Sequence, residues 1–550
     1  MNLVLMTGNE ALKYVNSEKF QLKWKSLYAS CPWATACQHP DFVAPWYELY
    51  YTLFLPVVIL SENDDQSLNG ILTLALHRKE DKLMGAGERQ AEYHGWIESP
   101  YTKNNFIKIA IKKIREKFPD IDLSLKYLPP GIPLDWIGDR GSFGKLCSIR
   151  SHPRPVMQID EAAMNRQRAK KNNRQNYNRL KKLGNVQFEK VTEHDHFIRI
   201  FEELRIQYDF RQGALYHNMP FLTDPLKKLF YLELHKNGLL HTTILTVDGK
   251  IAASHSGLLS EGRAVHLGIN THSPEFAAHS PGNLLLAMLG VQMAIEKIPL
   301  LDLTPGGDGY KENFATAHDA AFELTIYSDL KSRMKNEAIL GLMRFTKARL
   351  RASGYRTADF WTALDKLKKF RLPVLHRLPR KLREPSTAQY CHFQHCHKSQ
   401  IIIKNEINIK KNNLNDILKF DSHHSSMTHW EFFGTVMERM ERSQHLYTFV
   451  DDNRLLVYCW IRMRSADSSS QSSGQESMRS SNSIVLFDLY VQEEFKNTEI
   501  VQRFVCQLLY ELKRMNINEA IHYSGDLSKE LQTAVRRCGF ADDSVRTMVA

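Results

Sequence analysis

The sequence predicts a mixed α/β (α+β) protein assembled from repeated units, and three observations favour this class. Residues 238–270 read as three strands joined by tight turns. An apolar helix over residues 282–297 follows, and the strand "LLDL" then leads into a glycine-rich loop. The same order of three strands, a helix and a strand recurs at residues 446–540.

Composition sets the limits within which these units must fit. A chain of 550 residues with 43% apolar and 24% charged residues predicts a globular protein of two to four domains. The eight cysteines lack the spacing of a disulfide framework, which favours a reducing compartment. The start lacks the pattern of a signal peptide, and the apolar run at residues 50–60 is too short to span a bilayer. We therefore expect a cytoplasmic protein.

Positive charge is concentrated in two stretches. Residues 166–182, "RQRAKKNNRQNYNRLKK", carry eight basic side chains and no acid, and residues 366–383 are also basic. Such runs attract phosphate groups, and the partners they suggest are tRNA or an anionic membrane surface, which would place the protein at the periphery of the inner membrane. A solvated helix face and a basic linker are the alternative interpretation.

The segment from residue 239 to residue 315 has the clearest local signals. Asp248-Gly249 between two apolar runs predicts a hairpin, because glycine accepts positive φ. The third strand is expected at "AVHLGIN" (264–270), and Pro281 suits the first turn of the helix that follows. A helix N-terminus carries unpaired N–H groups and partial positive charge, so it favours phosphate, and Gly282 would allow close approach.

These elements and several motifs resemble the CelD-like acetyltransferases of bacterial cellulose and exopolysaccharide biosynthesis, a family of the GNAT superfamily related to the Fem peptidyltransferases. The resemblance covers about residues 20–330. The matching stretches are "HPDFVAPWYELY" (39–50), "LMGAGERQAEYHGW" (83–96), the basic run with the following glycine (166–184), "RQG" (211–213), "SPGNLL" (280–285) and "LDLTPGGDGYKENF" (301–314). One departure is Glu92 before Tyr93, where an aspartate is more usual in the family.

The resemblance implies two GNAT-like folds in tandem. Residues 1–155 would form the first half, on the acceptor side, and residues 156–330 the second half, which would bind the acyl donor. Residues 331–400 are expected to be a basic helical linker. Residues 401–550 would be a third, degenerate GNAT-like module, because "KNTE" (496–499) replaces the glycine-rich donor loop and Glu499 would compete with a phosphate for the helix amides.

The implied reaction is N-acyl transfer from acetyl-CoA or another acyl-CoA to an amine. The donor would lie on Ser280, Pro281, Gly282, Asn283 and Leu284. The implied acceptor-side or substrate-binding residues are Tyr93, Arg174, Arg211 and Asp302, although Asp302 could instead order the glycine loop.

Four residues are candidates for catalysis, each with a structural alternative. Tyr310 could protonate the leaving thiolate or only pack, and Lys311 could stabilise the oxyanion, grip a donor phosphate or be a surface charge. Asp308 suits acceptor binding or base work, because it lies on a loop at a strand end. His266 could act as a base through water or be structural.

The acceptor is expected to be an amine-bearing small molecule or a sugar precursor of polysaccharide or cell-envelope biosynthesis. Two other classes stay open: a Fem-like peptidyltransferase that uses aminoacyl-tRNA, and a non-catalytic scaffold of GNAT-like modules. No metal is expected. "CHFQHCHK" (391–398) lacks a second pair of ligands at zinc spacing, so a surface loop is favoured there.

Overall fold

The computed structural model divides into two compact units. The first unit contains Met1–Arg205, Pro220–His272 and His279–Gly354, and the second contains Ile206–Met219, Ser273–Ala278 and Tyr355–Ala550. The structure describes residues 2–100, 105–138, 144–306, 309–352, 391–395, 406–422, 425, 427–464, 483–495, 499–514, 520–525, 532–533, 536–538 and 540–542. Among these residues, no helix is long and apolar enough to cross a membrane.

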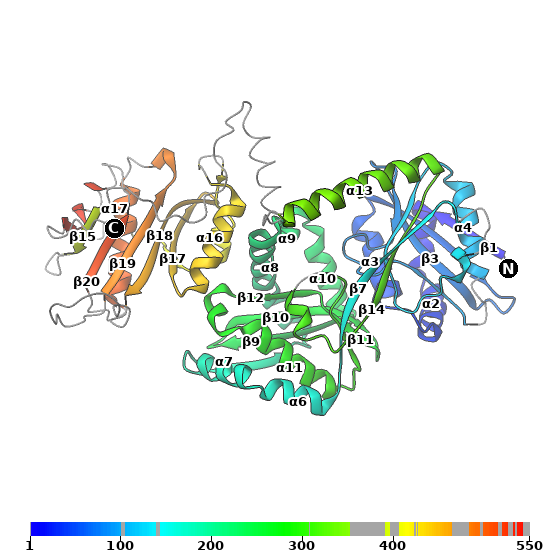
Figure 1. Ribbon diagram of the computed structural model, residues 1–550, viewed down its shortest axis with the longest axis horizontal. Helices are drawn as coiled ribbons and strands as arrows, with labels where there is room; N and C mark the ends of the chain where they lie inside the picture. The colour runs from blue at the N-terminus through cyan, green and yellow to red at the C-terminus, as the bar shows by residue number, and fades with distance from the viewer. Residues whose placement is uncertain are drawn as a thin grey trace. The chain divides into compact units, whose positions relative to one another are not determined.

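One 14-stranded mixed sheet organises the first unit, so the predicted mixed α/β class is confirmed (Figure 1). Its order is β1-β2-β3-β4-β6-β14-β7-β13-β11-β10-β9-β8, with β5 beside β3 and β12 beside β10. The strands are β1 (Asn2–Thr7), β2 (Phe54–Glu62), β3 (Leu68–His77), β4 (Leu83–Gly85), β5 (Trp96–Glu98), β6 (Leu123–Leu128), β7 (Cys147–Gln158), β8 (Val186–Lys190), β9 (Leu240–Val247), β10 (Lys250–Ser260), β11 (Ala264–His266), β12 (Ile269–His272), β13 (Leu300–Asp302) and β14 (Ala317–Ile326).

Helices connect these strands. They are α1 (Gly8–Val15), α2 (Glu18–Ser30), α3 (Pro40–Tyr50), α4 (Asn105–Lys117), α5 (Asp135–Gly138), α6 (Glu161–Ala169), α7 (Lys171–Lys181), α8 (His194–Tyr216), α9 (Pro220–Thr223), α10 (Leu226–Lys236), α11 (Pro281–Ile295), α12 (Gly309–Glu312) and α13 (Leu330–Ala352), with 3₁₀ turns η1 (Ala36–Gln38) and η2 (Pro274–His279). In α4, apolar residues at helical spacing, such as Phe106 and Ala110, join a core with β2, β3 and β6. In α11, Leu286, Leu289 and Met293 join a second core with β11 and β13.

The two predicted halves share strands of the same sheet. Strand β14 lies between β6 and β7 and pairs antiparallel with both. The boundary predicted at residue 155 falls inside β7, which also pairs with β13. A segment late in the chain therefore completes the sheet between the two halves.

Two predicted elements are each interrupted. The basic helix expected over residues 166–182 is two helices, α6 and α7, that meet at Lys170, whose ψ of 142° is not helical. The strand expected at 264–270 is also wrong as a single strand, because the chain breaks at Leu267 and Gly268 between β11 and β12. The Gly268 N–H donates to the His266 carbonyl at 2.9 Å, which turns the chain sharply at this point.

The second unit contains a seven-stranded sheet of order β16-β17-β18-β19-β20-β15-β21. Its elements are β15 (Cys391–His395), β16 (Lys410–Lys411), α15 (Leu414–Ile417), α16 (His429–Glu441), β17 (His445–Asp451), β18 (Arg454–Arg464), β19 (Ser483–Val491), the 3₁₀ turn η5 (Glu493–Phe495), α17 (Ile500–Arg514), β20 (Ala520–Gly525) and β21 (Phe540–Asp542). Strands β17, β18 and β19 form an antiparallel meander, and β20 pairs parallel with β19 after α17, in the order expected from the sequence.

One prediction in this unit is wrong. The surface loop expected at residues 391–398 is strand β15 over its first five residues, and it pairs with β20 and β21. The stretch "CHFQH" alternates polar and apolar residues, a strand signal that the histidine and cysteine spacing obscured. The basic residues 366–383 and residues 496–498 of "KNTE" lie outside the described residues.

A buried histidine packs tightly against the first half of the sheet. His94 is 4% exposed, its Nε2 donates to the Glu88 carbonyl at 3.0 Å, and its Nδ1 accepts from the Lys126 N–H at 3.2 Å. A Cβ on Gly85 would lie 2.4 Å from the His94 ring, so only glycine fits there. Burial lowers the pKa of His94 to about 4. The ring is therefore held neutral in one tautomer.

We predict that Gly257→Ala destabilises the first unit. A Cβ at Gly257 would lie 1.7 Å from the His266 carbonyl oxygen, so β10 and β11 would have to separate. We expect a loss of about 2 kcal/mol or more in the free energy of unfolding, measured by urea denaturation. The control is Gly341→Ala in α13, where nothing lies near the new Cβ and a gain of about 0.5–1 kcal/mol is expected. Equal stability of Gly257→Ala and the wild type would contradict this packing.

We predict that His94 makes folding stability depend on pH. The unfolded histidine takes up a proton below about pH 6.5, whereas the folded one resists until about pH 4. Stability should therefore fall by about 3 kcal/mol as the pH drops across this window. In His94→Gln, this part of the slope should disappear from urea unfolding curves recorded between pH 7 and pH 4. A variant with the wild-type slope would show that His94 does not titrate in this way.

Candidate active site

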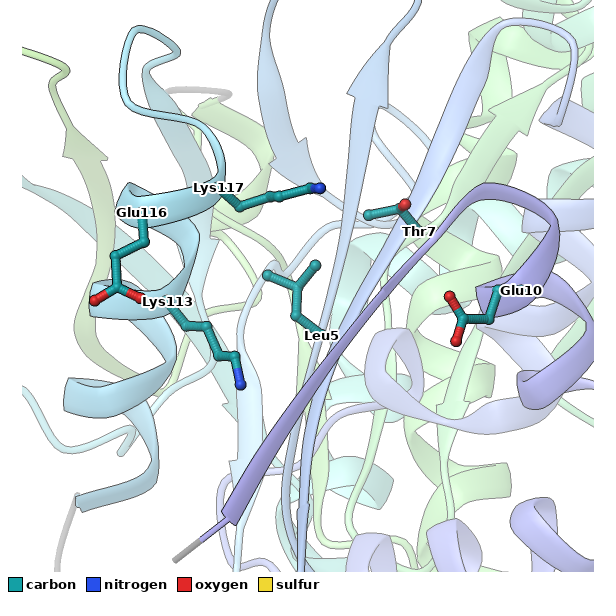
Figure 2. A pocket seen from close by; sticks show the side chains of 6 residues that line it. All are labelled: Leu5, Thr7, Glu10, Lys113, Glu116 and Lys117. Atoms are coloured by element: carbon teal, nitrogen blue, oxygen red, sulfur yellow. The ribbon is translucent and has the colours of Figure 1, made fainter.

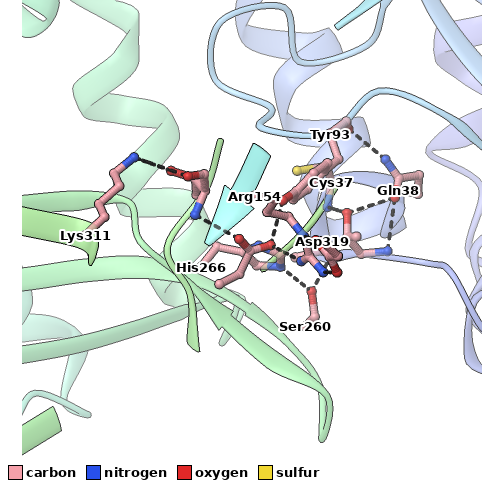
Figure 3. Close-up of polar contacts among 12 residues, drawn as sticks. Cys37, Gln38, Tyr93, Arg154, Ser260, His266, Lys311 and Asp319 are labelled. Atoms are coloured by element: carbon pink, nitrogen blue, oxygen red, sulfur yellow. Dashed lines mark hydrogen bonds and ion pairs between the residues drawn. The ribbon is translucent and has the colours of Figure 1, made fainter. Parts of the chain in front are cut away.

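A buried carboxylate, Asp302, is the last residue of β13. Its side chain is fully buried, and Oδ2 accepts hydrogen bonds from the Tyr93 hydroxyl at 2.6 Å and from Arg154 Nη1 at 2.8 Å (Figure 3). Burial alone would raise the pKa of Asp302, but its contacts with His266, Arg154 and Tyr93 outweigh burial and hold the pKa well below the usual range. Asp302 is therefore a carboxylate at neutral pH.

Arg154 connects this carboxylate to a second one. Arg154 is 5% exposed and lies on β7, opposite Asp319 of β14 in the register of the sheet. Its Nε donates to Asp319 Oδ1 at 2.6 Å and its Nη2 donates to Asp319 Oδ2. The guanidinium therefore binds Asp319 with two nitrogens and Asp302 with a third, which is the geometry that favours arginine over lysine.

His266 of β11 lies beside the same carboxylate. Its Nε2 is 2.8 Å from the Ser260 hydroxyl, and Ser260 accepts a hydrogen bond from the Ala36 N–H at 2.9 Å. Its Nδ1 approaches Asp302 Oδ2 at 3.3 Å, an ion-pair distance without the alignment of a hydrogen bond. Since the ring is 4% exposed and both nitrogens face protein groups, this geometry favours the structural alternative for His266 over a base.

A strained residue connects Asp302 to Lys311. Thr304 has φ of 62°, in the left-handed region, which costs about 1–3 kcal/mol for a β-branched residue. Its N–H donates to Asp302 Oδ1 at 2.8 Å, and its carbonyl and hydroxyl oxygens each lie 3.3 Å from Lys311 Nζ. Lys311 is 5% exposed, so it is not the surface charge considered as an alternative. Neighbouring Tyr310 is half-buried and packs against the core of β11 and α11.

The predicted donor residues surround the start of α11. Ser280 adopts a left-handed conformation before the helix, and no side-chain hydrogen bond from Ser280 caps the first turn. Gly282 is half-buried and Asn283 exposed, whereas Pro281 and Leu284 are buried. A Cβ on Gly282 would be only in ordinary contact with His272, so the protein around it leaves room there.

The basic helix α7 packs beside α11 (Figure 1). Burial lowers the pKa of His279, immediately before α11, and the charge of Arg179 on α7 lowers it further. The charge of Arg179 thus acts on the residue before Ser280, and both Arg174 and Arg179 are exposed on α7. Positive charge and a helix N-terminus occur together at this place.

Several predicted site residues do not belong to this cluster, and two of them are not among the described residues of the first unit. Asp308 lies outside the described residues. Arg211 belongs to the second unit, where its charge opposes the burial that raises the pKa of Glu441. The predicted residues that the structure brings together are Tyr93, His266, Asp302 and Lys311.

Four residues of the cluster were missed by sequence reasoning: Arg154, Ser260, Thr304 and Asp319. Arg154 lies in the stretch "SHPRPV", within the part of β7 that is buried. A charged residue beside apolar strand residues was the signal that could have identified it. Ser260 and Thr304 gave no such signal, because their contacts depend on tertiary structure.

A separate surface pocket lies between β1 and α4 (Figure 2). Its volume is about 390 Å³, and it is lined by Leu5, Thr7, Glu10, Lys113, Glu116 and Lys117. None of the residues around Asp302 lines it. Among the described residues, no group of three or more histidine, cysteine, aspartate or glutamate side chains could hold a metal ion.

Solved structures with a similar fold include three that are 10–12% identical to this chain. FemX has a TM-score of 0.40 and 10% identity, with 56% of this chain and 96% of that chain covered. A tandem GNAT protein from the clavulanic acid biosynthesis pathway has a TM-score of 0.37 and 12% identity, with 60% and 99% covered. The C-terminal domain of a putative lysylphosphatidylglycerol synthetase from Agrobacterium fabrum has a TM-score of 0.37 and 12% identity, with 60% and 96% covered. No curated protein matches the sequence.

A family model matches the part of the chain that contains α11 and Lys311. Residues 167–312 match the model described as an acetyltransferase (GNAT) domain. This stretch runs from the basic helix through the meander and α11 to the end of α12. Residues 167–312 are therefore similar to the GNAT acetyltransferase domain that this model describes.

Proposed function

We propose that the first unit is an N-acyltransferase that moves an acyl group, in the first place acetyl, from acyl-CoA to an amine acceptor. The observation that carries this proposal is that the chain leaves β13 after β11 and continues as β12 beside another strand. Strand β11 pairs parallel with β13 at Val265–Leu301 and His266–Asp302, whereas β12, the continuation of the same chain run, pairs with β10. An extended acyl-carrying arm could enter between β12 and β13 and reach Asp302 and Lys311.

The start of α11 supports a phosphate-binding role. The first turn offers backbone N–H groups and partial positive charge, and it lacks a capping bond from Ser280. Of the predicted donor residues, Ser280, Gly282 and Asn283 are at least partly exposed to solvent at this turn. Pro281 and Leu284 are buried and would support the conformation of the turn. Arg179 adds a full positive charge close by. A pyrophosphate group fits this combination.

The reaction that follows is direct transfer between two bound substrates. The amine nitrogen attacks the thioester carbonyl carbon, the carbon–sulfur bond breaks, and the thiolate takes a proton. Lys311, held at the end of β13, would stabilise the oxyanion, and Tyr310 would protonate the thiolate. Asp308 would accept the proton from the amine, and Tyr93 and Asp302 would order the loop on the acceptor side. Arg174 and Arg211 stay proposals for acceptor contacts.

The finer assignment is a CelD-like enzyme of polysaccharide or cell-envelope biosynthesis. The acceptor would then be an amine-bearing small molecule or a sugar precursor, and the enzyme would work in the cytoplasm or at the inner membrane surface. The second unit would be a degenerate GNAT-like module without donor binding, and residues 1–155 and 156–330 would serve acceptor and donor.

A second donor class has one observation in its favour. Lys170, Lys171 and Arg174 are exposed at the start of α7, the helix that packs beside α11, and such a basic face suits the backbone of an aminoacyl-tRNA. A scaffold role without catalysis would leave the buried Lys311 without an evident purpose.

We predict that Gly282→Asp abolishes acyl-CoA binding and leaves the fold intact. The new carboxylate would occupy the phosphate position and stabilise the helix N-terminus itself. Calorimetry with acetyl-CoA, alongside the melting temperature, measures both effects. Gly341→Asp, in an open position of α13, is the control and should bind like the wild type. Normal folding and wild-type affinity in Gly282→Asp would reject α11 as the donor site.

We predict that the α7 face separates the two donor classes. Replacement of Lys170, Lys171 and Arg174 by glutamine should leave the affinity for acetyl-CoA within about twofold of the wild type. These exposed charges do not contact acetyl-CoA in the proposed site, and distant exposed charges contribute little to binding. If the donor is aminoacyl-tRNA, the same variant should lose affinity for tRNA, and the dependence of binding on salt should become shallower. Filter binding at several salt concentrations decides between these results.

A further inference from the structure

The loop after β13 is held in an unfavourable backbone conformation. Thr304 is the second residue beyond the end of β13, and its φ of 62° is rare for a β-branched side chain. Such a conformation persists only where neighbouring contacts over-determine it. Here the Thr304 N–H donates to Asp302 Oδ1 at 2.8 Å, and the Leu303 N–H donates to the Pro155 carbonyl at 3.2 Å.

Thr304 in turn positions an ammonium group. Its carbonyl and hydroxyl oxygens both lie 3.3 Å from Lys311 Nζ, so two oxygens of one residue face the same cation. Lys311 is 5% exposed, so its side chain has little room to move. The position of the ammonium therefore depends on the conformation of Thr304.

The conformation of Thr304 depends on Asp302, and Asp302 depends on Arg154. One Asp302 oxygen binds the Thr304 N–H, and the other binds Arg154 Nη1 at 2.8 Å and the Tyr93 hydroxyl at 2.6 Å. Arg154 is itself fixed by two bonds to Asp319 across β7 and β14. A continuous series of hydrogen bonds thus runs from Arg154 through Asp302 and Thr304 to Lys311.

We propose that Arg154 is a positioning residue for Lys311, acting through Asp302 and the strained Thr304. This inference rests on the proposed function, in which Lys311 meets the thioester oxygen. Arg154 itself touches no substrate. Its role requires the planar fork of a guanidinium, because lysine keeps the charge but cannot bind Asp319 with two nitrogens and Asp302 with a third.

The test compares Arg154→Lys with Arg150→Lys, a matched control on the same strand. Arg150 is also paired with a carboxylate, but that carboxylate is Glu337, at 3.3 Å, and not Asp302. The first readout needs no activity: competitive acetic anhydride labelling at pH 8, with mass spectrometry, gives the rate at Lys311 relative to the other lysines. We expect Arg154→Lys to raise the Lys311 rate at least tenfold, and Arg150→Lys to leave it unchanged.

Thr304→Gly keeps the test valid if Arg154→Lys does not fold. Glycine adopts positive φ without strain but lacks the hydroxyl, so Lys311 should be labelled several times faster in this variant as well. A uniform increase at all lysines would indicate general unfolding and would overturn the specific role. Unchanged labelling of Lys311 in a folded Arg154→Lys protein would overturn it too.

The second readout is turnover of acetyl-CoA with glucosamine as the probe amine. We expect Arg154→Lys to lower kcat at least tenfold with KM for acetyl-CoA within twofold, and the double variant with Lys311→Met to be no slower than Lys311→Met alone. Additive losses would show that Arg154 does not act through Lys311. If acetyl-CoA neither binds nor reacts while labelling changes as expected, the proposed function fails and the positioning role stands.

Discussion

The buried ion pair between Asp302 and Arg154 is the interaction on which the first unit depends. A carboxylate removed from water is costly unless it is paired and hydrogen-bonded, and here Arg154, Tyr93 and the Thr304 N–H supply those partners. The partners come from β7, from the first half of the chain and from the loop after β13. Their convergence fixes the end of β13 relative to the sheet and to the start of α12. The pair therefore connects stability to the geometry of the candidate site.

Much of the fold follows from local patterns in the sequence. The apolar spacing of α11 and α17 predicted helices within two residues of the observed bounds, and Asp248-Gly249 predicted the hairpin of β9 and β10. A short strand at "LLDL" was also predictable, although Asp302 was expected inside it and is instead the last residue of β13. These features depend on neighbours a few residues apart, which is the range that periodicity and turn chemistry describe.

The contacts of the site could not be predicted in the same way. Arg154 and Asp302 are 148 residues apart and Tyr93 and Asp302 are 209 apart, so no local pattern relates them. The break between β11 and β12 depends on how closely Gly257 approaches the His266 carbonyl, which is a property of the packed sheet. The left-handed Thr304 likewise contradicts the preference of its residue type, and the contacts that hold it, with Asp302 and through Leu303 with Pro155, form only in the folded sheet.

The place of β14 in the sheet also has a consequence for synthesis on the ribosome. Strand β14 begins at Ala317, yet it must lie between β6, which ends at Leu128, and β7. When only the first half of the chain has left the ribosome, β14 has not yet been made, and the edge of β6 that will pair with β14 is open. The first half can then reach its final pairing only after nearly two hundred further residues have emerged. Translation speed over this interval and chaperone protection of the β6 edge should thus influence the yield of folded protein more than the stability of either half.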